Sequence, residues 1–349
     1  MKKPILVIKF GSASITNQGE VDDRIVLEIA RQCAQLQSTY NIVLVSSGAV
    51  AAGKRFIPKY TGTLSQRKAA AAIGNPLLVM TYASFFRPYK IALAQSLCER
   101  HHFSNRSQFL QLKSTYETLW KNNVIPIANE NDVVSNKELK FSDNDELATL
   151  IAVGFGAEKL LFSTSVPGVL NESGEVIPQI DKIDRSILAL PSKGVSDVGL
   201  GGMVSKLNFS RMATQMGIEV VIFSMEKENG LLKAVRGENG TVCLPQKKQL
   251  SSKKKWLASG SLISGLIQVD DGAIEAILKR KSLLAVGIKK VVQDFVVGEV
   301  FQIMDEQQVV HAVGKSRIDS VSLMCKDGLK SREGLRNLEI AHADDIVLL

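Results

Sequence analysis

The chain has 349 residues, which is more than one hydrophobic core usually supports, so we expect two domains. Hydrophobic residues make up 45% of the chain and charged residues 22%, which excludes a largely disordered protein. The formal net charge of +8 suits acidic small molecules or nucleic acid as partners, and it is too small to decide between them.

The first two-thirds of the chain alternate between strand patterns and helix patterns. Short apolar runs predict strands at residues 4–10, 42–45, 91–97, 124–128, 159–162 and 219–223. Helix-length segments separate these runs, and in residues 21–36 the apolar side chains recur with helical spacing. This alternation predicts an α/β fold, in which helices sandwich a mostly parallel sheet and ligands bind at the carboxyl ends of the strands.

The pattern changes after residue 244. Residues 249–255 are polar, basic and without periodicity, which is typical of a linker. Beyond them, short strand patterns occur at residues 262–269, 283–285, 299–304, 309–313 and 345–349, with one helix pattern at residues 272–281. We therefore expect a first domain at residues 1–248 and a second, small β-rich domain at residues 256–349.

The cysteines and the apolar runs indicate the compartment. Four cysteines are spread along the chain without a C-x-x-C pair, which argues against a disulfide framework and a cysteine zinc site. No run approaches the roughly 18 apolar residues that span a bilayer. At the N-terminus, Lys9 and Gly11 interrupt the apolar run too early for a signal peptide. We expect a cytoplasmic protein that does not associate with membranes.

Two polar groups follow the first two predicted strands. Lys9 ends the first strand, where a buried ammonium group is costly unless it meets an anion. Taken alone, a lysine that reaches solvent is the simpler interpretation. Ser46 and Ser47 end the second strand, where they could bind a ligand or cap a helix. The adjoining segment 48–55 nearly matches a Walker A loop, but Arg55 replaces the required Ser or Thr, so we reject a P-loop in favour of a closely packed turn.

Two further groups lie later in the chain. Residues 129–132 and 143–145 are rich in Asp and Asn, which could bind an ammonium group, organise hydrated Mg²⁺ or form ordinary turns. Residues 199–206 begin a helix with glycines, whose backbone N–H groups can approach a phosphate, and Lys206 can add its charge. Each signal is weak alone, but together they make phosphoryl transfer the leading reaction class.

These motifs, in this order, resemble the amino acid kinase superfamily, and within it the glutamate 5-kinase family. The matching segments are residues 7–12, 46–53, 129–132, 142–145 and 201–206. The tail, with Trp256 and residues 268–273, resembles a PUA domain. The similarity covers nearly the whole chain, and it implies an amino acid kinase catalytic domain at 1–248 and a PUA-like domain at 256–349.

The resemblance implies an activity and its partners. The expected reaction is ATP-dependent phosphorylation of the γ-carboxylate of L-glutamate to L-glutamyl 5-phosphate, the first step of proline biosynthesis, with MgATP as co-substrate. It also implies feedback inhibition by proline, a homo-oligomer and glutamyl phosphate reductase as a partner. The alternatives are a superfamily kinase acting on acetylglutamate, aspartate, carbamate or UMP, or RNA binding by the tail, where residues 279–281 and 289–290 are basic.

The resemblance also assigns site residues. The expected catalytic residues are Lys9, Lys206 and Asp145. The expected glutamate-binding residues are Ser47, Asp132 and Asn144. The expected nucleotide-binding residues are Lys9, Thr164, Ser165, Leu200, Gly201, Gly202, Met203, Val204, Ser205 and Lys206. Mg²⁺ is expected on the ATP phosphates, near Asp143 and Asp145.

Two positions depart from the family pattern. Ser165 stands where the family commonly has Asp, and Leu200 stands where it commonly has Thr. These changes remove a carboxylate beside the nucleotide and a hydroxyl near the phosphates, whereas backbone N–H contacts survive both. We therefore expect changed nucleotide affinity and base preference before any change of reaction.

Overall fold

The computed structural model describes residues 3–99, 102–103, 106–134, 144–193, 200–246, 263–325, 328–329 and 338–348. The chain divides into two compact units. One comprises Met1–His102 and Arg106–Lys248, and the other comprises Phe103–Asn105 and Gln249–Leu349. The linker expected at residues 249–255 lies outside the described residues, as does Trp256.

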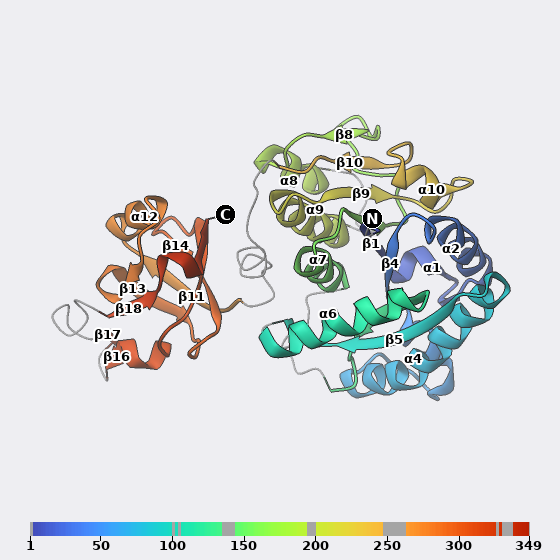
Figure 1. Ribbon diagram of the computed structural model, residues 1–349, viewed down its shortest axis with the longest axis horizontal. Helices are drawn as coiled ribbons and strands as arrows, with labels where there is room; N and C mark the ends of the chain where they lie inside the picture. Colours follow the sequence, from blue (N-terminus) through green and yellow to red (C-terminus); the bar gives the residue numbers. More distant parts are fainter. Residues whose placement is uncertain are drawn as a thin grey trace. The chain divides into compact units, whose positions relative to one another are not determined.

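The first unit is built on an eight-stranded sheet (Figure 1). Its strands, in spatial order, are β5 (Ala92–Cys98), β6 (Val124–Glu130), β4 (Asn41–Ser46), β1 (Ile5–Phe10), β7 (Lys159–Ser163), β9 (Glu219–Phe223), β10 (Thr241–Cys243) and β8 (Gln179–Ile180). Neighbouring strands are parallel except β9 and β10. All six strands expected from apolar runs are present. Strands β8 and β10 were not expected, because two or three residues are too few to show a period.

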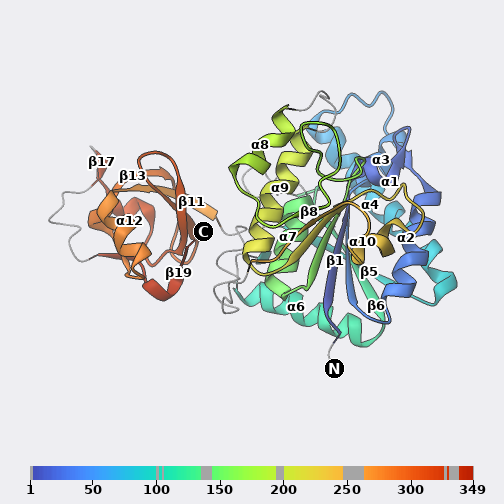
Figure 2. The same cartoon turned by 90° about the horizontal axis from the view of Figure 1, so that it is seen from above.

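Helices cover both faces of this sheet, as the α/β pattern predicted (Figure 2). The helices of this unit are α1 (Ser12–Ile15), α2 (Asp23–Leu36), α3 (Ala49–Gly53), α4 (Leu64–Phe86), α6 (Arg106–Lys121), α7 (Asn144–Phe155), α8 (Arg185–Lys193), α9 (Leu200–Gln215) and α10 (Gly230–Val235), with short 3₁₀ turns η1 (Lys54–Phe56) and η2 (Arg87–Tyr89). A two-stranded ribbon, β2 (Thr16–Asn17) with β3 (Glu20–Val21), precedes α2. Helices α2, α4 and α10 share one hydrophobic core with the sheet, and α7 packs on the other face beside α9.

Alternation along β1 decides where Lys9 points. Leu6, Ile8 and Phe10 belong to the core formed with α2, α4 and α10. Because successive strand residues point to opposite faces, Val7 and Lys9 face the layer that contains α7. The central position of β1, between β4 and β7, buries all six of its residues. The sequence therefore directs one lysine into a closed layer between the sheet and a helix.

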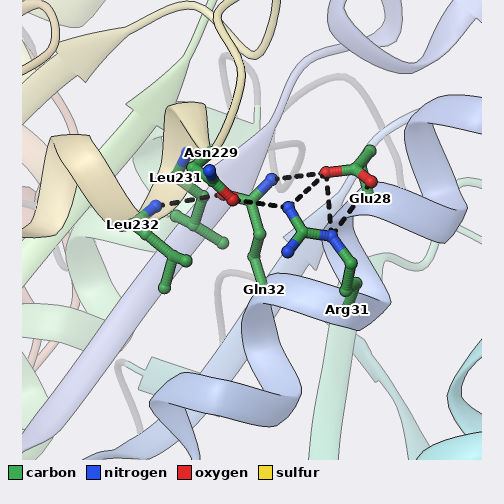
Figure 3. A network of polar contacts seen from close by, with 6 residues as sticks. All are labelled: Glu28, Arg31, Gln32, Asn229, Leu231 and Leu232. Carbon is green, nitrogen blue, oxygen red and sulfur yellow. Dashed lines mark hydrogen bonds and ion pairs between the residues drawn. The ribbon is translucent and has the colours of Figure 1, made fainter.

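A network of hydrogen bonds joins helix α2 to the beginning of α10 (Figure 3). Gln32 is only 1% exposed, and its Oε1 accepts hydrogen bonds from the backbone N–H groups of Leu231 and Leu232 at 2.9 and 3.1 Å. Beside it, Arg31 Nη2 donates to Asn229 Oδ1 at 2.6 Å. The two bonds to Gln32 satisfy backbone N–H groups that the first turn of a helix leaves without partners.

A pair of glycines allows α3 and α4 to approach closely. A Cβ atom on Gly53 would lie 1.9 Å from the carbonyl oxygen of Ala70, and one on Gly74 would lie 1.7 Å from that of Ala49. No side chain fits in either position. The segment that nearly matches a Walker A loop is therefore the packed turn expected from its small residues, and it carries α3 rather than a phosphate-binding loop.

Helix α4 differs from one expectation. With the turn that follows it, residues 64–89 are long and apolar enough to cross a membrane by length and composition, with a mean hydropathy of 1.4 in the best window. The expectation that no segment has this character was wrong, because it considered only uninterrupted apolar runs. A single such helix is weak support for a membrane span, and the buried side chains Leu78, Tyr82 and Phe86 pack in the core beneath the sheet.

The second unit has its own sheet and core. Strands β13 (Ile288–Gln293), β11 (Ile263–Val269), β14 (Val300–Met304), β15 (Val310–Lys315) and β19 (Ile346–Leu348) form the sheet in that order. Its smaller elements are α12 (Asp271–Leu278), η3 (Ala285–Gly287), η4 (Ser320–Leu323), η5 (Ala343–Asp345), and the pairs β12 (Leu283–Leu284) with β18 (Glu339–Ala341) and β16 (Met324–Cys325) with β17 (Gly328–Leu329). Phe295 and Phe301 stack at its centre, with ring centroids 4.6 Å apart. Strand β13 was not expected, because exposed lysines at 289 and 290 break the apolar pattern.

Candidate active site

The candidate site lies where the central strands end. Strand order reverses beside β1, since β4 continues the sheet on one side and β7 on the other. Crevices form at such reversals, at the carboxyl ends of parallel strands. The ends of β1, β4, β6, β7 and β9 bring together most of the polar groups singled out in the sequence.

Two lysines converge on one buried aspartate. Asp145, at the start of α7, is 1% exposed, and its Oδ1 lies 2.5 Å from Lys9 Nζ. Its Oδ2 accepts a hydrogen bond from Lys206 Nζ, on α9, at 3.1 Å. Lys9 is 5% exposed and Lys206 is 8% exposed. Three elements far apart in the sequence thus form one charged cluster.

The cluster places two ammonium groups against one carboxylate. Lys9 and Lys206 both contact Asp145, and all three residues are buried. Charges removed from water are costly unless they are paired. Two ammonium groups that converge on one point can both contact a phosphate anion, so the arrangement suits binding of a transferring phosphoryl group.

Two glycines keep the approach to these lysines open. A Cβ atom on Gly11 would lie 3.5 Å from Lys9 Nζ and 3.8 Å from Ser14 Oγ. A Cβ atom on Gly202 would lie 3.8 Å from Lys206 Nζ. A Cβ atom in either position would be in van der Waals contact with the ammonium group, whereas glycine leaves that side of the group uncovered.

A chain of amides lies beside the charged cluster. Asn144, immediately before Asp145, donates from Nδ2 to Ser47 Oγ at 2.9 Å and to Asn129 Oδ1 at 2.8 Å. Asn129 Nδ2 donates in turn to Asn75 Oδ1 at 2.9 Å. The chain joins the end of β4, the start of α7, the end of β6 and the middle of α4. These groups are neutral, in contrast to the neighbouring lysines.

The remaining expected residues lie around this centre. Asp132 is half-buried in the turn after β6, three residues beyond Asn129. Thr164 follows β7, and its N–H donates to the carbonyl oxygen of Phe223 at the end of β9, with exposed Ser165 next to it. The segment 200–206 forms the first turns of α9, with Gly202 exposed and Met203, Val204 and Ser205 between it and Lys206. Asp143 lies outside the described residues.

Two residues of the amide chain were not among the expected site residues. Asn129 belongs to a motif singled out in the sequence, but no role was assigned to it. Asn75 carries no local signal except that it is a polar residue in the uncharged part of α4, and the structure shows it to be 4% exposed. Its place in the site depends on the close contact of α3 with α4, which sequence periodicity does not show.

Other chemistries find little support here. Among the described residues, no group of three His, Cys, Asp or Glu side chains is placed to hold a metal ion. Cys98 ends β5 near the amide chain, since its carbonyl oxygen accepts from Asn131 N–H. Burial raises the pKa of the Cys98 thiol to about 11, so this cysteine stays protonated and is a poor nucleophile.

Comparison with known proteins identifies the family. The sequence matches the amino acid kinase family over residues 4–224 and the PUA domain over residues 265–336. The first match covers more than half of the chain. The chain belongs to the amino acid kinase family. As a kinase of this family, it uses ATP as the phosphoryl donor.

Relatives match nearly the full length of this amino acid kinase. The glutamate 5-kinase of Vibrio parahaemolyticus is 34% identical over 362 residues, covering 99% of this chain and 96% of that protein. That of Sodalis glossinidius is 34% identical over 361 residues, covering 98% of each. That of Dictyoglomus turgidum is 33% identical, covering 98% of this chain and 97% of that protein.

Solved structures share the fold of this family. Giardia carbamate kinase matches with a TM-score of 0.50 and 19% identity, over 70% of this chain and 100% of that one. Carbamate kinase from Giardia lamblia bound to AMP-PNP also matches with a TM-score of 0.50, at 15% identity, over 70% and 99% of the two chains. At this level of identity, the likeness extends to the fold alone.

Proposed function

We propose that the protein transfers the γ-phosphoryl group of ATP to the γ-carboxylate of L-glutamate, which forms L-glutamyl 5-phosphate for proline biosynthesis. The observation that carries the proposal is the contact of Lys9 and Lys206 with Asp145 at the strand ends, in a family whose full-length relatives are glutamate 5-kinases. We infer the substrate from the relatives, and the arrangement of the two lysines supports phosphoryl transfer as the reaction class.

The proposed reaction needs no general base. The γ-carboxylate of glutamate is already ionised at pH 7. One of its oxygens attacks the γ-phosphorus while the bond from that phosphorus to the bridging oxygen of ADP breaks. The enzyme must align the two substrates and stabilise the developing negative charge. Lys9 and Lys206 would supply positive charge, and Asp145 would hold both ammonium groups in position.

Mg²⁺ would neutralise charge on the ATP phosphates when bound. Both oxygens of Asp145 already contact lysine ammonium groups, so direct ligation by Asp145 would require a lysine to move. Mg²⁺ usually keeps several waters and relies on few protein ligands. We therefore assign the ion mainly to the phosphate oxygens, with Asp143 and Asp145 contributing negative charge nearby.

The two substrates would occupy different parts of the strand-end edge. Glutamate is assigned to Ser47, Asp132 and Asn144, beside the amide chain. The nucleotide is assigned to Lys9, Thr164–Ser165 and residues 200–206, where backbone N–H groups at the start of α9 can meet phosphates. The absence of a carboxylate at Ser165 and of a hydroxyl at Leu200 predicts altered nucleotide affinity rather than a different reaction.

A coupled ADP-release assay tests the proposal. The purified enzyme should turn over with L-glutamate and MgATP, and much less with acetylglutamate, aspartate, carbamate or UMP as acceptor. Turnover with one of those acceptors in preference to glutamate would assign the chain to another activity of the same family. Adding proline should inhibit by competition with glutamate, and no inhibition at millimolar concentrations would contradict that part of the proposal.

We propose a cytoplasmic homo-oligomer that passes its unstable acyl phosphate to glutamyl phosphate reductase. Residues 69–86 of α4 contain no charged side chain, yet Ala72, Pro76 and Met80 are exposed, and α4 packs against the edge strand β5. An uncharged face of this kind suits contact with a second copy. Light scattering should therefore show smaller particles for Met80→Glu than for the natural chain.

The alternative of RNA binding by the tail has weaker support. Lys289 pairs with Glu306, and Lys279 lies 3.3 Å from Glu275, so part of the expected basic surface is neutralised. Phosphate contacts depend on positive charge that is available to the nucleic acid. Salt-sensitive RNA binding by the tail would nevertheless revive this alternative.

A further inference from the structure

The amide chain of the candidate active site ends in a buried donor without a partner. Asn75 is 4% exposed, and its Nδ2 atom has no hydrogen-bond partner within the described part of the chain. A buried N–H group without a partner costs stability, and such groups are rare in folded proteins. Asn75 is absent from the residues that the sequence assigned to the site, so its donor needs an explanation.

The orientation of each amide in this chain follows from one backbone group. The N–H of Glu130 can only donate, and it meets Asn129 at 2.9 Å, so the atom it meets is Oδ1. The other atom of Asn129 is therefore Nδ2, which donates, and the atom of Asn75 that it contacts must be oxygen. The remaining atom of Asn75 is then a nitrogen.

The same reasoning applies on the other side of Asn129. Its Oδ1 also contacts Asn144, and two oxygens would repel, so the contacting atom of Asn144 is Nδ2. The remaining atom of Asn144 is an oxygen, and it too is covered and has no partner among the described residues. The chain thus ends in an unsatisfied donor at Asn75 and an unsatisfied acceptor at Asn144.

A donor and an acceptor at the two ends of this chain are chemically complementary to the carboxylate and the ammonium group that an amino acid carries on its α-carbon. A carboxylate oxygen accepts from Nδ2 of an amide, and an ammonium group donates to Oδ1 of an amide. Asn144 adjoins Asp145 and the lysines, whereas Asn75 is two hydrogen bonds further along the chain. Asn75 therefore faces the end of the acceptor that is distant from the reacting carboxylate.

We propose that Asn75 Nδ2 donates a hydrogen bond to the α-carboxylate of the acceptor amino acid and sets the preference for a free α-carboxylate. The inference rests on the proposed function, because it concerns the acceptor of that reaction. Both terminal atoms are covered, so the acceptor displaces neighbouring groups as it enters. The energetic cost of the unsatisfied donor is then recovered on binding, which favours the acceptor that satisfies it.

The test replaces the donor and changes the acceptor together. Asn75→Asp keeps an oxygen for Asn129 and substitutes a negatively charged oxygen for the nitrogen, at nearly the same size. The assay compares kcat/KM for L-glutamate with kcat/KM for its α-amide, in the natural enzyme and in the variant. We expect the ratio of the two values to fall about 10- to 100-fold in Asn75→Asp, with the KM for ATP within about threefold of the natural value.

A structural role would give a different result. If Asn75 only supports Asn129, both acceptors lose activity equally and the ratio is unchanged, which would overturn the proposal. Should Asn75→Asp fail to fold, Asn75→Leu removes the donor without adding charge, and the ratio should still fall about tenfold. An unchanged ratio in Asn75→Leu would also overturn it.

A control separates this effect from loss of stability. Trp120 Nε1 donates to the carbonyl oxygen of Ile42 at 2.9 Å. Ile42 lies near the amino end of β4, whereas the candidate active site lies at the carboxyl ends of the strands. Trp120→Phe should lower the melting temperature and leave the acceptor ratio unchanged. The natural enzyme is assayed first, so a lack of turnover with glutamate would refute the proposed function, whereas a constant ratio would refute only the role of Asn75.

Discussion

The two halves of the candidate active site use opposite chemistry. One half is the charged cluster of Lys9, Asp145 and Lys206, in which two ammonium groups contact one carboxylate. The other is the amide chain of Asn75, Asn129 and Asn144 with Ser47, which has no net charge. Adjacent residues of α7, Asn144 and Asp145, connect the two halves.

The difference corresponds to the two tasks of the proposed reaction. A phosphoryl group in transfer is highly charged and symmetrical, so positive charge stabilises it without detailed hydrogen-bond geometry. An acceptor amino acid must be distinguished from close analogues, and amides of fixed orientation do this because each atom is either a donor or an acceptor. In the proposed reaction, the charged cluster therefore accelerates phosphoryl transfer, and the fixed donors and acceptors of the amide chain select the acceptor.

The largest expected effect comes from removing a charge from the cluster. Lys206→Ala and Lys9→Ala should each lower kcat about 1,000-fold, because charge that develops in the transition state is no longer matched. Steady-state kinetics measures the change, and thermal melting checks that each variant is folded. Near-normal turnover in a folded variant would remove that lysine from the mechanism.

A matched control is available at the amino ends of the strands, opposite the candidate active site. Lys159, at the start of β7, is also paired, with its Nζ 2.5 Å from Glu219 Oε1. Lys159→Ala removes the same side chain from a similar ion pair that is remote from the site. It should lower thermal stability and leave kcat within about threefold of the natural value.

Asp132→Ala affects the acceptor half of the comparison. We expect the KM for glutamate to rise about 10- to 100-fold while the KM for ATP changes little, because this carboxylate is assigned to the α-ammonium group of glutamate. Asp132→Asn should give an intermediate effect, since an oxygen remains. Equal changes in both KM values would indicate that Asp132 only supports the turn after β6.

Gln32→Met tests how much the contact between α2 and α10 contributes to the stability of the first unit. It removes the side-chain oxygen that accepts from two N–H groups at the start of α10, and we expect the free energy of unfolding to fall by about 2–3 kcal/mol. Urea denaturation measures this change. Gln35→Met makes the same replacement on an exposed position of the same helix and should change stability by less than about 0.5 kcal/mol.

The smallest effect is expected from removing the second unit. A chain that ends at Lys248 should fold and phosphorylate glutamate, because all proposed catalytic residues precede Leu207 and the first unit has its own core. Circular dichroism and the ADP-release assay measure the two properties. A truncated chain that is cooperatively folded and inactive would show that residues beyond 248 complete the site.

The sequence predicted the order of strands and helices better than it predicted the side-chain contacts of the site. Strands such as β1 and β4 were evident because both of their faces are buried, which requires continuous apolar runs. Lys9 could be recognised for the same reason, as a cation inside such a run. Strand β13 escaped notice because Lys289 and Lys290 project from an exposed face, although the β-rich character of the second unit was recognised.

Residues that depend on tertiary contacts could not be found in this way. Asn75, on α4, becomes part of the site because Asn129 donates to it from the end of β6, and Asn144 donates to Asn129 from the start of α7. Each of these asparagines, read locally, is compatible with a turn or a helix end. Their mutual hydrogen bonds exist only in the folded protein, so no periodicity reveals them.

The glycine contact between α3 and α4 also bears on how this protein can evolve. Every single-nucleotide missense change in a glycine codon adds at least a Cβ atom, and at Gly53 and Gly74 that atom would overlap a backbone carbonyl oxygen. Exposed Ala69 and Ala72, on the same helix, face no such restriction. Gly53 and Gly74 are therefore the positions that lineages cannot change one codon at a time, and the close contact of α3 with α4 is inherited with those two codons.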